Sequence, residues 1–236
     1  MPEFRNIVIL TGAGISAESG LATFRGPDGL WEGHRVEDVC TPEALTRDAT
    51  LVHRFYDERR AKLAEVRPNP AHDALARLDA LWPGKLLIVT QNVDDLHERA
   101  GVGEGTDRLL HMHGELNSAL CAHCEARLPW AGSLPPGSIC PACTAPALRP
   151  DIVFFGEIPY QMDRIEAALA DVDLFVSIGT SGAVYPAAGF VQTARYRGAH
   201  TVELNLDPSA GSILFHESRM GAASLLVPQF VAELLA

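Results

Sequence analysis

Short apolar runs recur along the chain, and each of them ends in small or polar residues. The runs cover residues 6–10, 85–90, 109–112, 173–178 and 200–206, and apolar character also resumes at residues 151–155. Runs of this length that are bounded by turn-forming residues are typical of buried strands. Because helical stretches separate them, the pattern predicts a parallel α/β sheet. Polar residues that follow parallel strands meet at one edge of the sheet, so we expect them to line one crevice.

The stretches between the runs carry helical signals. Residues 32–66 are rich in charge and have helical periodicity. One face of a helix in this segment would hold Leu51, Phe55, Arg59 and Leu63. Asn69 is predicted to cap a further helix whose first position is Pro70 and which extends to about Leu81. Other helices are expected at residues 159–170, at about 185–197 and from about residue 228 onward.

The first run passes into a Gly-rich turn, Thr11-Gly12-Ala13-Gly14-Ile15-Ser16-Ala17, which matches the pattern G-x-G-x-x-G/A. Such glycines let the backbone turn sharply and approach a pyrophosphate, which the free amides at the next helix start can hold. The pattern alone is a weak signal, but its position directly after a strand favours a dinucleotide site. The acidic residue that usually binds the ribose is missing, because the expected distance falls in Gly29-Leu30-Trp31-Glu32. Residues 19–26 are polar and aromatic instead, which predicts a loop folded over a ligand.

Composition narrows the class of protein. With 236 residues, the chain can bury a large core as one domain or as one domain with an insert. A net charge of −11 argues against a general nucleic-acid surface, which would be basic. No apolar run approaches the length that spans a bilayer, and the N-terminus lacks the layout of a signal peptide. We therefore expect a cytoplasmic protein with no nucleic-acid or membrane partner.

Four of the five cysteines form two C-x-x-C pairs, Cys121 with Cys124 and Cys140 with Cys143. This spacing is typical of tetrahedral Zn²⁺ held by four thiolates. A closed four-thiolate site is structural, because no coordination position is left for a substrate. Two redox pairs, or reduced cysteines in the core, are the alternatives. The remaining cysteine, Cys40, is predicted to be an ordinary small apolar residue rather than a nucleophile.

Several motifs occur together in a fixed order, and with them the chain resembles the sirtuins, NAD-dependent protein lysine deacylases. The resemblance covers nearly the whole chain. It depends on GAGISAESGLATFRG at residues 12–26, TQNVDDLHERAG at 90–101, HMHGEL at 111–116, the four cysteines, RPDIVFFGE at 149–157, IGTS at 178–181 and NLD at 205–207. No single motif is decisive, but their order and spacing leave little room for another family. The short ends of the chain resemble the compact bacterial form.

The resemblance implies a fold of class α/β. A Rossmann-like parallel sheet with helices on both faces would comprise residues 1–31, 67–115 and 149–236. A small domain would combine a helical insert at residues 32–66 with a zinc-binding module at 116–148. NAD and an acylated lysine side chain would meet in the cleft between the two domains.

The resemblance also implies the chemistry. The acyl oxygen attacks the ribose carbon that carries nicotinamide, and the acyl group ends on ADP-ribose. His113 is the expected base, because an imidazole titrates near neutral pH and can accept a proton from a ribose hydroxyl. His111 is its rival, since in a strand it would share the face of His113. Asn92 and Asp94 resemble the pair that fixes the nicotinamide end, although Asp94 could equally cap a helix before Leu96.

Further residues are expected to bind the cofactor. Phe24 would shield the reactive ribose carbon from water, and Arg25 would organise its loop. Asn205 would hold the adenine ribose, which accounts for the missing acidic residue near the first strand. The complete set of expected cofactor contacts is Gly12, Ala13, Gly14, Ile15, Ala17, Glu18, Phe24, Arg25, Trp31, Gln91, Asn92, Val93, Asp94, Gly179, Thr180, Ser181, Asn205, Leu206, Asp207 and Ala223.

A Tyr-x-x-Arg pair, Tyr56 and Arg59, indicates which kind of acyl group the protein would bind. A phenol and a guanidinium three residues apart share one helix face and can bind a carboxylate at the end of an acyl chain. Succinyl- and malonyl-lysine carry such a carboxylate and acetyl-lysine does not. The alternative is a solvated surface arginine beside a tyrosine of the core. The pair resembles that of the sirtuin class that removes acidic acyl groups.

The sequence therefore predicts a desuccinylase or demalonylase that keeps deacetylase activity, acting as a monomer on acylated lysines. A protein ADP-ribosyltransferase and a catalytically weak NAD sensor are the alternatives. A zinc-ribbon nucleic-acid binder is disfavoured by the acidic net charge.

Overall fold

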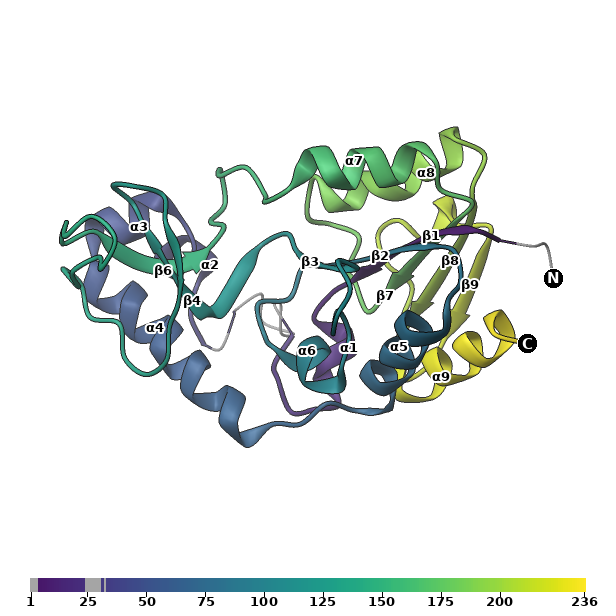
Figure 1. Cartoon of the computed structure of the whole chain (residues 1–236), viewed down its shortest axis with the longest axis horizontal. Coiled ribbons are helices and arrows are strands. Elements are labelled where there is room, and N and C mark those ends of the chain that lie inside the picture. Colours follow the sequence, from purple (N-terminus) through teal and green to yellow (C-terminus); the bar gives the residue numbers. More distant parts are fainter. Residues whose placement is uncertain (1–3, 24–30, 32) are drawn as a thin grey trace.

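A parallel sheet forms the centre of the computed structural model, which describes residues 4–23, 31 and 33–236 (Figure 1). Its strands within these residues are β1 (Asn6–Thr11), β2 (Lys85–Thr90), β3 (Leu109–His111), β7 (Leu174–Ile178), β8 (His200–Asn205) and β9 (Glu217–Met220). They lie in the order β3-β2-β1-β7-β8-β9, and each neighbouring pair is parallel. The order reverses between β1 and β7, so the sheet has a switch point there.

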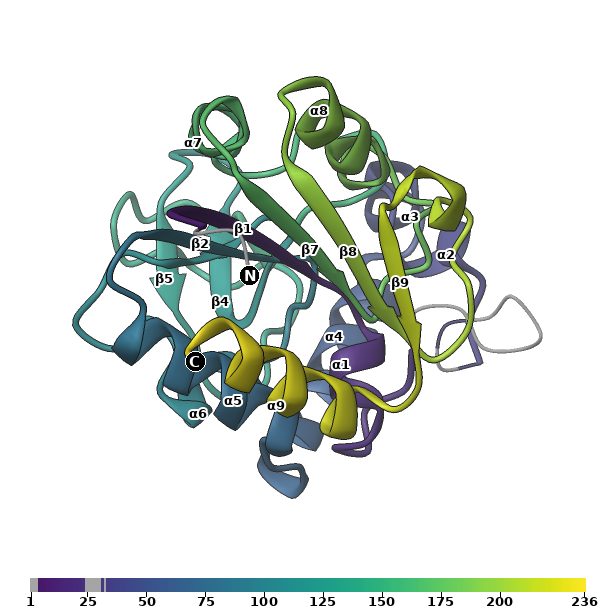
Figure 2. The same ribbon diagram turned by 90° about the vertical axis from the view of Figure 1, so that its right-hand side faces the viewer.

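Helices cover both faces of this sheet (Figure 2). One face carries α5 (Pro70–Leu81) and α9 (Ala223–Leu234), and the other carries α7 (Met162–Ala170) and α8 (Phe190–Tyr196). Along β1, Ile7 and Ile9 pack toward α5 and α9, whereas Val8 and Leu10 pack toward α7 and α8. Because both faces of the central strands are buried, these strands occur as continuous apolar runs rather than as alternating ones.

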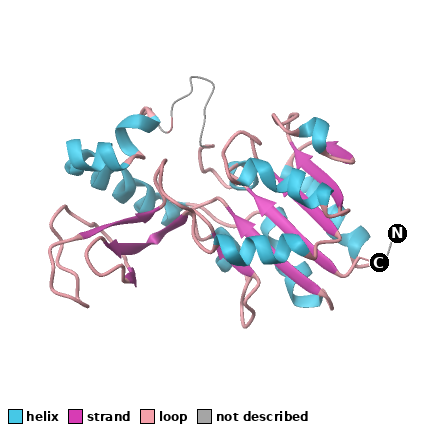
Figure 3. Cartoon of the chain, turned by 90° about the horizontal axis from the view of Figure 1, so that it is seen from above, coloured by secondary structure: helices cyan, strands magenta, loops and turns pink. Residues whose placement is uncertain are grey.

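A second lobe lies to one side of the parallel sheet (Figure 3). It combines helices with a small antiparallel sheet of order β5-β4-β6. Its elements are α2 (Val36–Val39), α3 (Pro42–Arg47), α4 (Ala49–Lys62), β4 (Gly114–Cys121), β5 (Arg127–Pro129) and β6 (Leu148–Ile152). The domain boundaries at residues 31, 66, 115 and 148 stay a prediction.

The remaining described elements are short. They are α1 (Gly14–Ala17), α6 (Leu96–Ala100) and the 3₁₀ turns Leu63–Glu65, Ala187–Gly189 and Ser212–Leu214. Among the described residues, no helix has the length and apolar character that crossing a membrane requires.

The start of α5 confirms the expected cap. The Asn69 side chain accepts from the backbone N–H of Ala71, and the His72 ring accepts the Asn69 N–H in return. Such a reciprocal arrangement satisfies backbone donors that the first helical turn leaves open. The strands at residues 85–90 and 200–205 also lie where the apolar pattern predicts them.

Two helix starts differ from the prediction. The last helix begins at Ala223, not near Pro228, because burial of Val227, Phe230 and Val231 outweighs the one hydrogen bond that Pro228 removes. The helix expected from residue 159 begins only at Met162.

The delay in α7 has a specific cause. The backbone N–H of Tyr160 donates to the Met112 carbonyl, and its hydroxyl donates to Asp151, so Tyr160 is held outside the helix. The helix expected at 185–197 is also divided, into the 3₁₀ turn Ala187–Gly189 and α8. The edge strand β9 was not predicted, since its side chains have no fully buried face and hence no apolar pattern.

Candidate functional site

Two Gly-rich turns meet at the switch point of the sheet. Gly12 follows β1 and Gly179 follows β7, and the N–H of Gly14 donates to the Gly179 carbonyl at 2.8 Å. A Cβ atom on Gly14 would lie 2.7 Å from the Cα of Gly179, and Gly179 itself has a φ of +63°. These glycines are therefore required by the contact between the turns as well as by any ligand. Open parallel sheets bind ligands at this position, outside the carboxyl ends of the strands.

A buried network joins the first turn to the residues after β2. The Ser16 hydroxyl donates to Asp94 Oδ2 at 3.0 Å and accepts from Asn92 Nδ2 at 3.1 Å. Burial raises the pKa of Asp94, while the N–H of Leu96 and the Ser16 hydroxyl act in the opposite direction. The structure thus brings Asn92 and Asp94 together, and it adds Ser16, which the sequence analysis did not select. The only sequence signal for Ser16 is a hydroxyl between two apolar residues of the turn.

His113 lies beside this network and is partly exposed. Its Nδ1 is 3.2 Å from the Gln91 carbonyl oxygen. Because a carbonyl only accepts, the hydrogen is on Nδ1 and the lone pair is on Nε2. Burial lowers the pKa of His113, and the hydrogen bond to Gln91 offsets this only in part. The ring is therefore neutral at pH 7, with Nε2 ready to accept a proton.

His111 has a different environment. Strand β3 ends at His111, so His113 is outside the strand and the expected shared strand face was wrong. The Nδ1 of His111 contacts the Asn92 carbonyl at 3.0 Å, and its Nε2 contacts Glu98 Oε1 at 2.6 Å. Burial lowers the pKa of His111, but the hydrogen bond and charge of Glu98 outweigh burial, so the pKa is above its ordinary value. Both nitrogens are thus engaged, and His111 is a poor candidate for a base.

The carboxyl ends of β7 and β8 are also joined. Asn205 Nδ2 donates to the Thr180 carbonyl at 2.8 Å, and the Asn205 carbonyl accepts from Gly221 N–H at 2.8 Å. Ser181 and Thr180 each accept a backbone N–H two residues further on. Thr180, Ser181 and Asn205 therefore lie at one sheet edge with the Gly-rich turns.

Several of the other residues expected to bind the cofactor lie in different parts of the structure. Glu18 binds the N–H and hydroxyl of Ser224, which places it beside Ala223 at the start of α9. Leu206 is 69% exposed, whereas Val93 packs against the apolar cluster of the second lobe. Phe24 and Arg25 lie outside the described residues. The roles of all these residues in cofactor binding stay predictions.

The Tyr56 and Arg59 pair lies on α4, at the side of the second lobe. Tyr56 is 0% exposed, and its ring packs against Phe55, Phe154 and Trp31. Its hydroxyl lies beside the Cys40 thiol but makes no hydrogen bond of good geometry with a described residue. The Arg59 guanidinium lies over the rings of Phe55 and Trp31. Trp31 thus contacts both members of the pair expected to bind the acyl group, and it also packs edge-on against Phe55.

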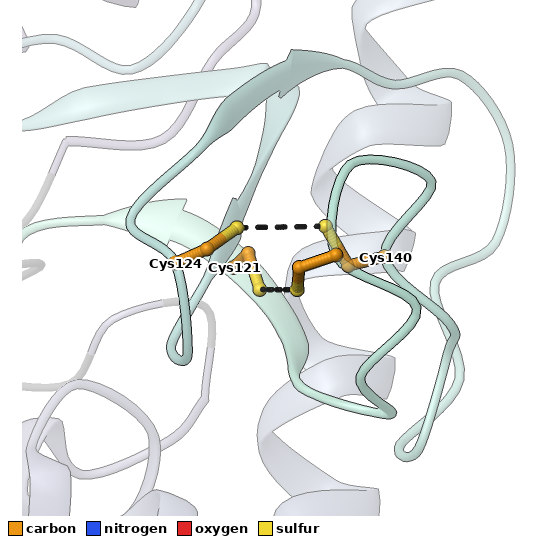
Figure 4. Close-up of side chains that lie close together, drawn as sticks. Cys121, Cys124 and Cys140 are labelled. Atoms are coloured by element: carbon orange, nitrogen blue, oxygen red, sulfur yellow. Dashed lines mark hydrogen bonds between the residues drawn. The ribbon is translucent and has the colours of Figure 1, made fainter.

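The four paired cysteines converge on one point (Figure 4). The sulfur atoms of Cys121 and Cys143 are 3.6 Å apart, those of Cys124 and Cys140 are 3.9 Å apart, and all four lie within 4.8 Å. Four thiolates around a tetrahedral Zn²⁺ have sulfur atoms about 3.8 Å apart, so the arrangement fits zinc. The residue after each pair, Glu125 or Thr144, has a φ near +60° and donates to the carbonyl of the first cysteine. The two pairs are thus similar knuckles that face each other.

Cys40 is separate from this cluster. It is buried, and burial raises the pKa of its thiol to about 11. The thiol is therefore protonated at pH 7, as expected of a small core residue rather than of a nucleophile.

Together, the switch-point site and the four-cysteine lobe define a Rossmann-like α/β protein with a metal-binding module. The chain belongs to the Sir2 family, whose family model matches residues 12–186. It is 53% identical, over 99% of its length and 96% of the relative's, to an NAD-dependent protein deacylase of Vibrio parahaemolyticus serotype O3:K6 (strain RIMD 2210633). The resemblance to sirtuins is thus confirmed.

Solved structures agree with this assignment. A Sir2 homologue in complex with ADP-ribose matches with a TM-score of 0.89 and 36% identity, over 98% of this chain and 92% of that one. A Sir2–p53 peptide–NAD⁺ complex matches with a TM-score of 0.81 and 27% identity, over 98% of this chain and 94% of that one. The predicted α/β fold class is therefore confirmed.

Proposed function

We propose that the protein is an NAD-dependent protein lysine deacylase that transfers the acyl group to ADP-ribose and releases nicotinamide. One observation carries the proposal: His113 presents a neutral ring with an available Nε2 beside the network of Asn92 and Asp94. A ring in this state can accept a proton from a ribose hydroxyl as that hydroxyl attacks the activated acyl group. The names of the relatives at 53% identity support the same reaction.

Other residues of the chain would position the reactants. Asn92 and Asp94 are held by Ser16 and would fix the nicotinamide end of NAD. The turns at Gly14 and Gly179 would let the backbone approach the phosphates, and Asn205 and Ala223 would lie on the adenosine side. The acylated lysine would enter from the second lobe, where Tyr56 and Arg59 lie.

We further propose that the preferred acyl group carries a carboxylate. A buried tyrosine hydroxyl without a good hydrogen-bond partner is costly, and an acyl carboxylate could accept from it. The Arg59 guanidinium, one helical turn away, supplies the complementary charge. We expect the enzyme to act as a monomer in the cytoplasm, with no nucleic-acid partner.

Labelled NAD tests the reaction. With NAD labelled in its adenosine part and a succinyl-lysine peptide, we expect nicotinamide release and label on O-acyl-ADP-ribose. Label on protein would favour ADP-ribosyl transfer instead. If acyl-lysine peptide elicits no nicotinamide, the chain would be an NAD sensor rather than an enzyme.

The pH dependence of the rate should reflect the lowered pKa of His113. Protonation at Nε2 removes the base, so the rate should fall with acid through that pKa, which is below the ordinary 6.5. The free-enzyme value appears in kcat/KM, which we would measure for an acetyl-lysine peptide from about pH 5 to pH 9. We expect a constant value around pH 7. An acid limb centred above pH 6.5 would contradict a neutral His113 with a lowered pKa.

Metal analysis should find about one Zn²⁺ per chain, as ligation by four thiolates requires. The residues that would hold it are Cys121, Cys124, Cys140 and Cys143. Cys140→Ser should lose the metal and loosen residues 121–143, because the loops around the two cysteine pairs have only a small apolar core of their own. Cys40→Ala is the matched control and should keep the metal. Purified protein without zinc, or zinc that survives Cys140→Ser unchanged, would refute this site.

A further inference from the structure

Helix α4 has two adjacent stripes of functional side chains. Tyr56 and Arg59 form the stripe proposed to bind the acyl carboxylate. His53, Asp57 and Arg60, at positions i, i+4 and i+7, form the other stripe and contact the part of the second lobe that carries the four cysteines, at Leu116 and Leu134. Helix α4 lies beside β4 and β6 of that lobe (Figure 1). The two stripes share one rigid helix, so whatever holds one stripe also places the other.

Asp57 is the centre of the second stripe. Its carboxylate accepts the backbone N–H of Leu134 at 3.0 Å and the hydroxyl of Ser133 at 2.6 Å. It also accepts from Arg60 NH1 at 2.6 Å, and its side chain is 18% exposed. Bonds to a charged acceptor that is shielded from water are stronger than neutral ones. Asp57 is therefore a substantial link between α4 and residues 133–134.

His53 and Arg60 hold the same segment on either side of Asp57. His53 Nδ1 donates to the Leu134 carbonyl at 2.6 Å, and Arg60 NH1 donates to the Gly132 carbonyl at 3.0 Å. The Nε of Arg60 donates to the Leu116 carbonyl in β4 at 2.5 Å. Three successive residues, 132–134, are thus bound by one face of α4.

The segment 132–134 is itself tied to the cysteine cluster. It lies in the loop between the two cysteine pairs, and Leu134 is 0% exposed. Leu134 packs in one apolar cluster with Cys121 and Cys140. The position of α4 along its axis is thereby coupled to the cysteine module through Leu134 and Asp57.

We infer that Asp57 is a positioning residue for acyl selectivity, because it holds α4 where Tyr56 and Arg59 can reach the acyl carboxylate. The inference depends on the proposed preference for acidic acyl groups. Acetyl-lysine has no carboxylate for the pair, so its turnover does not depend on this placement. A misplacement of about 1 Å costs up to roughly 100-fold in an oriented site.

The test compares Asp57→Asn with Glu58→Gln. Both variants remove one negative charge from α4, but Glu58 is exposed, and its ion pair with Arg54 is long, at 3.9 Å. For Asp57→Asn we expect kcat/KM for a succinyl-lysine peptide to fall roughly 10- to 100-fold through KM, with acetyl-lysine changed less than about twofold. Glu58→Gln should match the wild type on both peptides. An equal loss on both peptides, or no loss, would overturn the inference.

A second variant and a second measurement guard against a folding defect. Ser133→Ala removes one donor to Asp57 from an exposed residue and should lower succinyl turnover in the same direction. Amide hydrogen exchange over residues 49–62 should be faster in Asp57→Asn than in Glu58→Gln, with the zinc content unchanged in both. Unaltered exchange together with unaltered selectivity in Ser133→Ala would also count against the link.

The failure of this inference differs from the failure of the proposed acyl preference. If Arg59→Met leaves succinyl turnover intact, the acyl preference is wrong whatever Asp57 does. If Arg59→Met removes succinyl turnover and Asp57→Asn does not, only the positioning role is wrong.

Discussion

Replacing His113 with alanine should abolish turnover of both acetyl- and succinyl-lysine peptides while NAD still binds. The variant lacks the neutral ring of His113, which is the ring expected to accept the proton. A positioned base contributes about 10²- to 10⁴-fold, so the fall in kcat should be in that range or larger. Formation of deacylated peptide measures turnover, because nicotinamide leaves before the proton transfer assigned to His113. Calorimetry measures NAD affinity. The affinity should be nearly unchanged, because His113 acts on the proton rather than on the bound nucleotide.

His111→Ala is the control for this prediction. Its ring bridges the Asn92 carbonyl and Glu98, so its loss should loosen the loop after β2 without removing the base. We expect measurable turnover to remain. If His111→Ala is inactive and His113→Ala retains turnover, the base has been assigned to the wrong histidine.

Arg59→Met should remove most succinyl-lysine turnover and spare acetyl-lysine turnover. A lost hydrogen bond to a charged group costs about 1.5–3 kcal/mol, which corresponds to roughly 10- to 150-fold in kcat/KM. Methionine keeps an unbranched apolar stem but removes the guanidinium, so its contacts with the Phe55 and Trp31 rings and its hydrogen bond to the Phe55 carbonyl are lost with the charge. Turnover of acetyl-lysine shows whether those losses disturb the fold. The measurement is kcat/KM on one peptide that carries either acyl group.

Arg54→Met is the matched control, because Arg54 is on the same helix but is 64% exposed and forms a long ion pair with Glu58, at 3.9 Å. Such surface pairs contribute little, so both acyl groups should react at the wild-type rate. If succinyl turnover is intact in Arg59→Met, Tyr56 and Arg59 are an ordinary contact between a tyrosine of the core and an arginine. The protein would then be a deacylase without the proposed acidic preference.

The sheet and its main helices were predictable because their signals are local. A run such as residues 85–90 is apolar throughout because both faces of its strand are covered, and Asn69 with Pro70 marks a helix start by itself. The edge strand β9 was not predicted, because neither of its faces is fully buried and its sequence therefore has no apolar run. The start of α9 was predicted too late, because Pro228 usually ends or begins a helix, and here burial of Val227 and Phe230 stabilises helix on both sides of it.

The cysteine module was equally predictable, because four ligands in two short pairs carry their own spacing rule. The different roles of His111 and His113 were not predictable. Residues two positions apart share a face only if both belong to the strand. The strand ends at His111, and each ring then contacts a different carbonyl, of Asn92 or of Gln91. Which of the two rings is neutral depends on Glu98, thirteen positions away from His111.

The sequence by itself determined the fold class, most strands and the main helices of the parallel sheet, the cysteine cluster and the motifs of the family. Each of these features follows from hydrophobic periodicity or from the spacing of a few residues. Only the tertiary structure decided that Ser16 joins Asn92 to Asp94, that Gly14 and Gly179 are glycines partly for each other, and that Asp57 ties α4 to Leu134. Ser16 and Asn92 are 76 positions apart in the sequence, and Gly14 and Gly179 are 165 positions apart. Hydrogen bonds between residues so far apart produce no periodic pattern from which a single sequence could predict them.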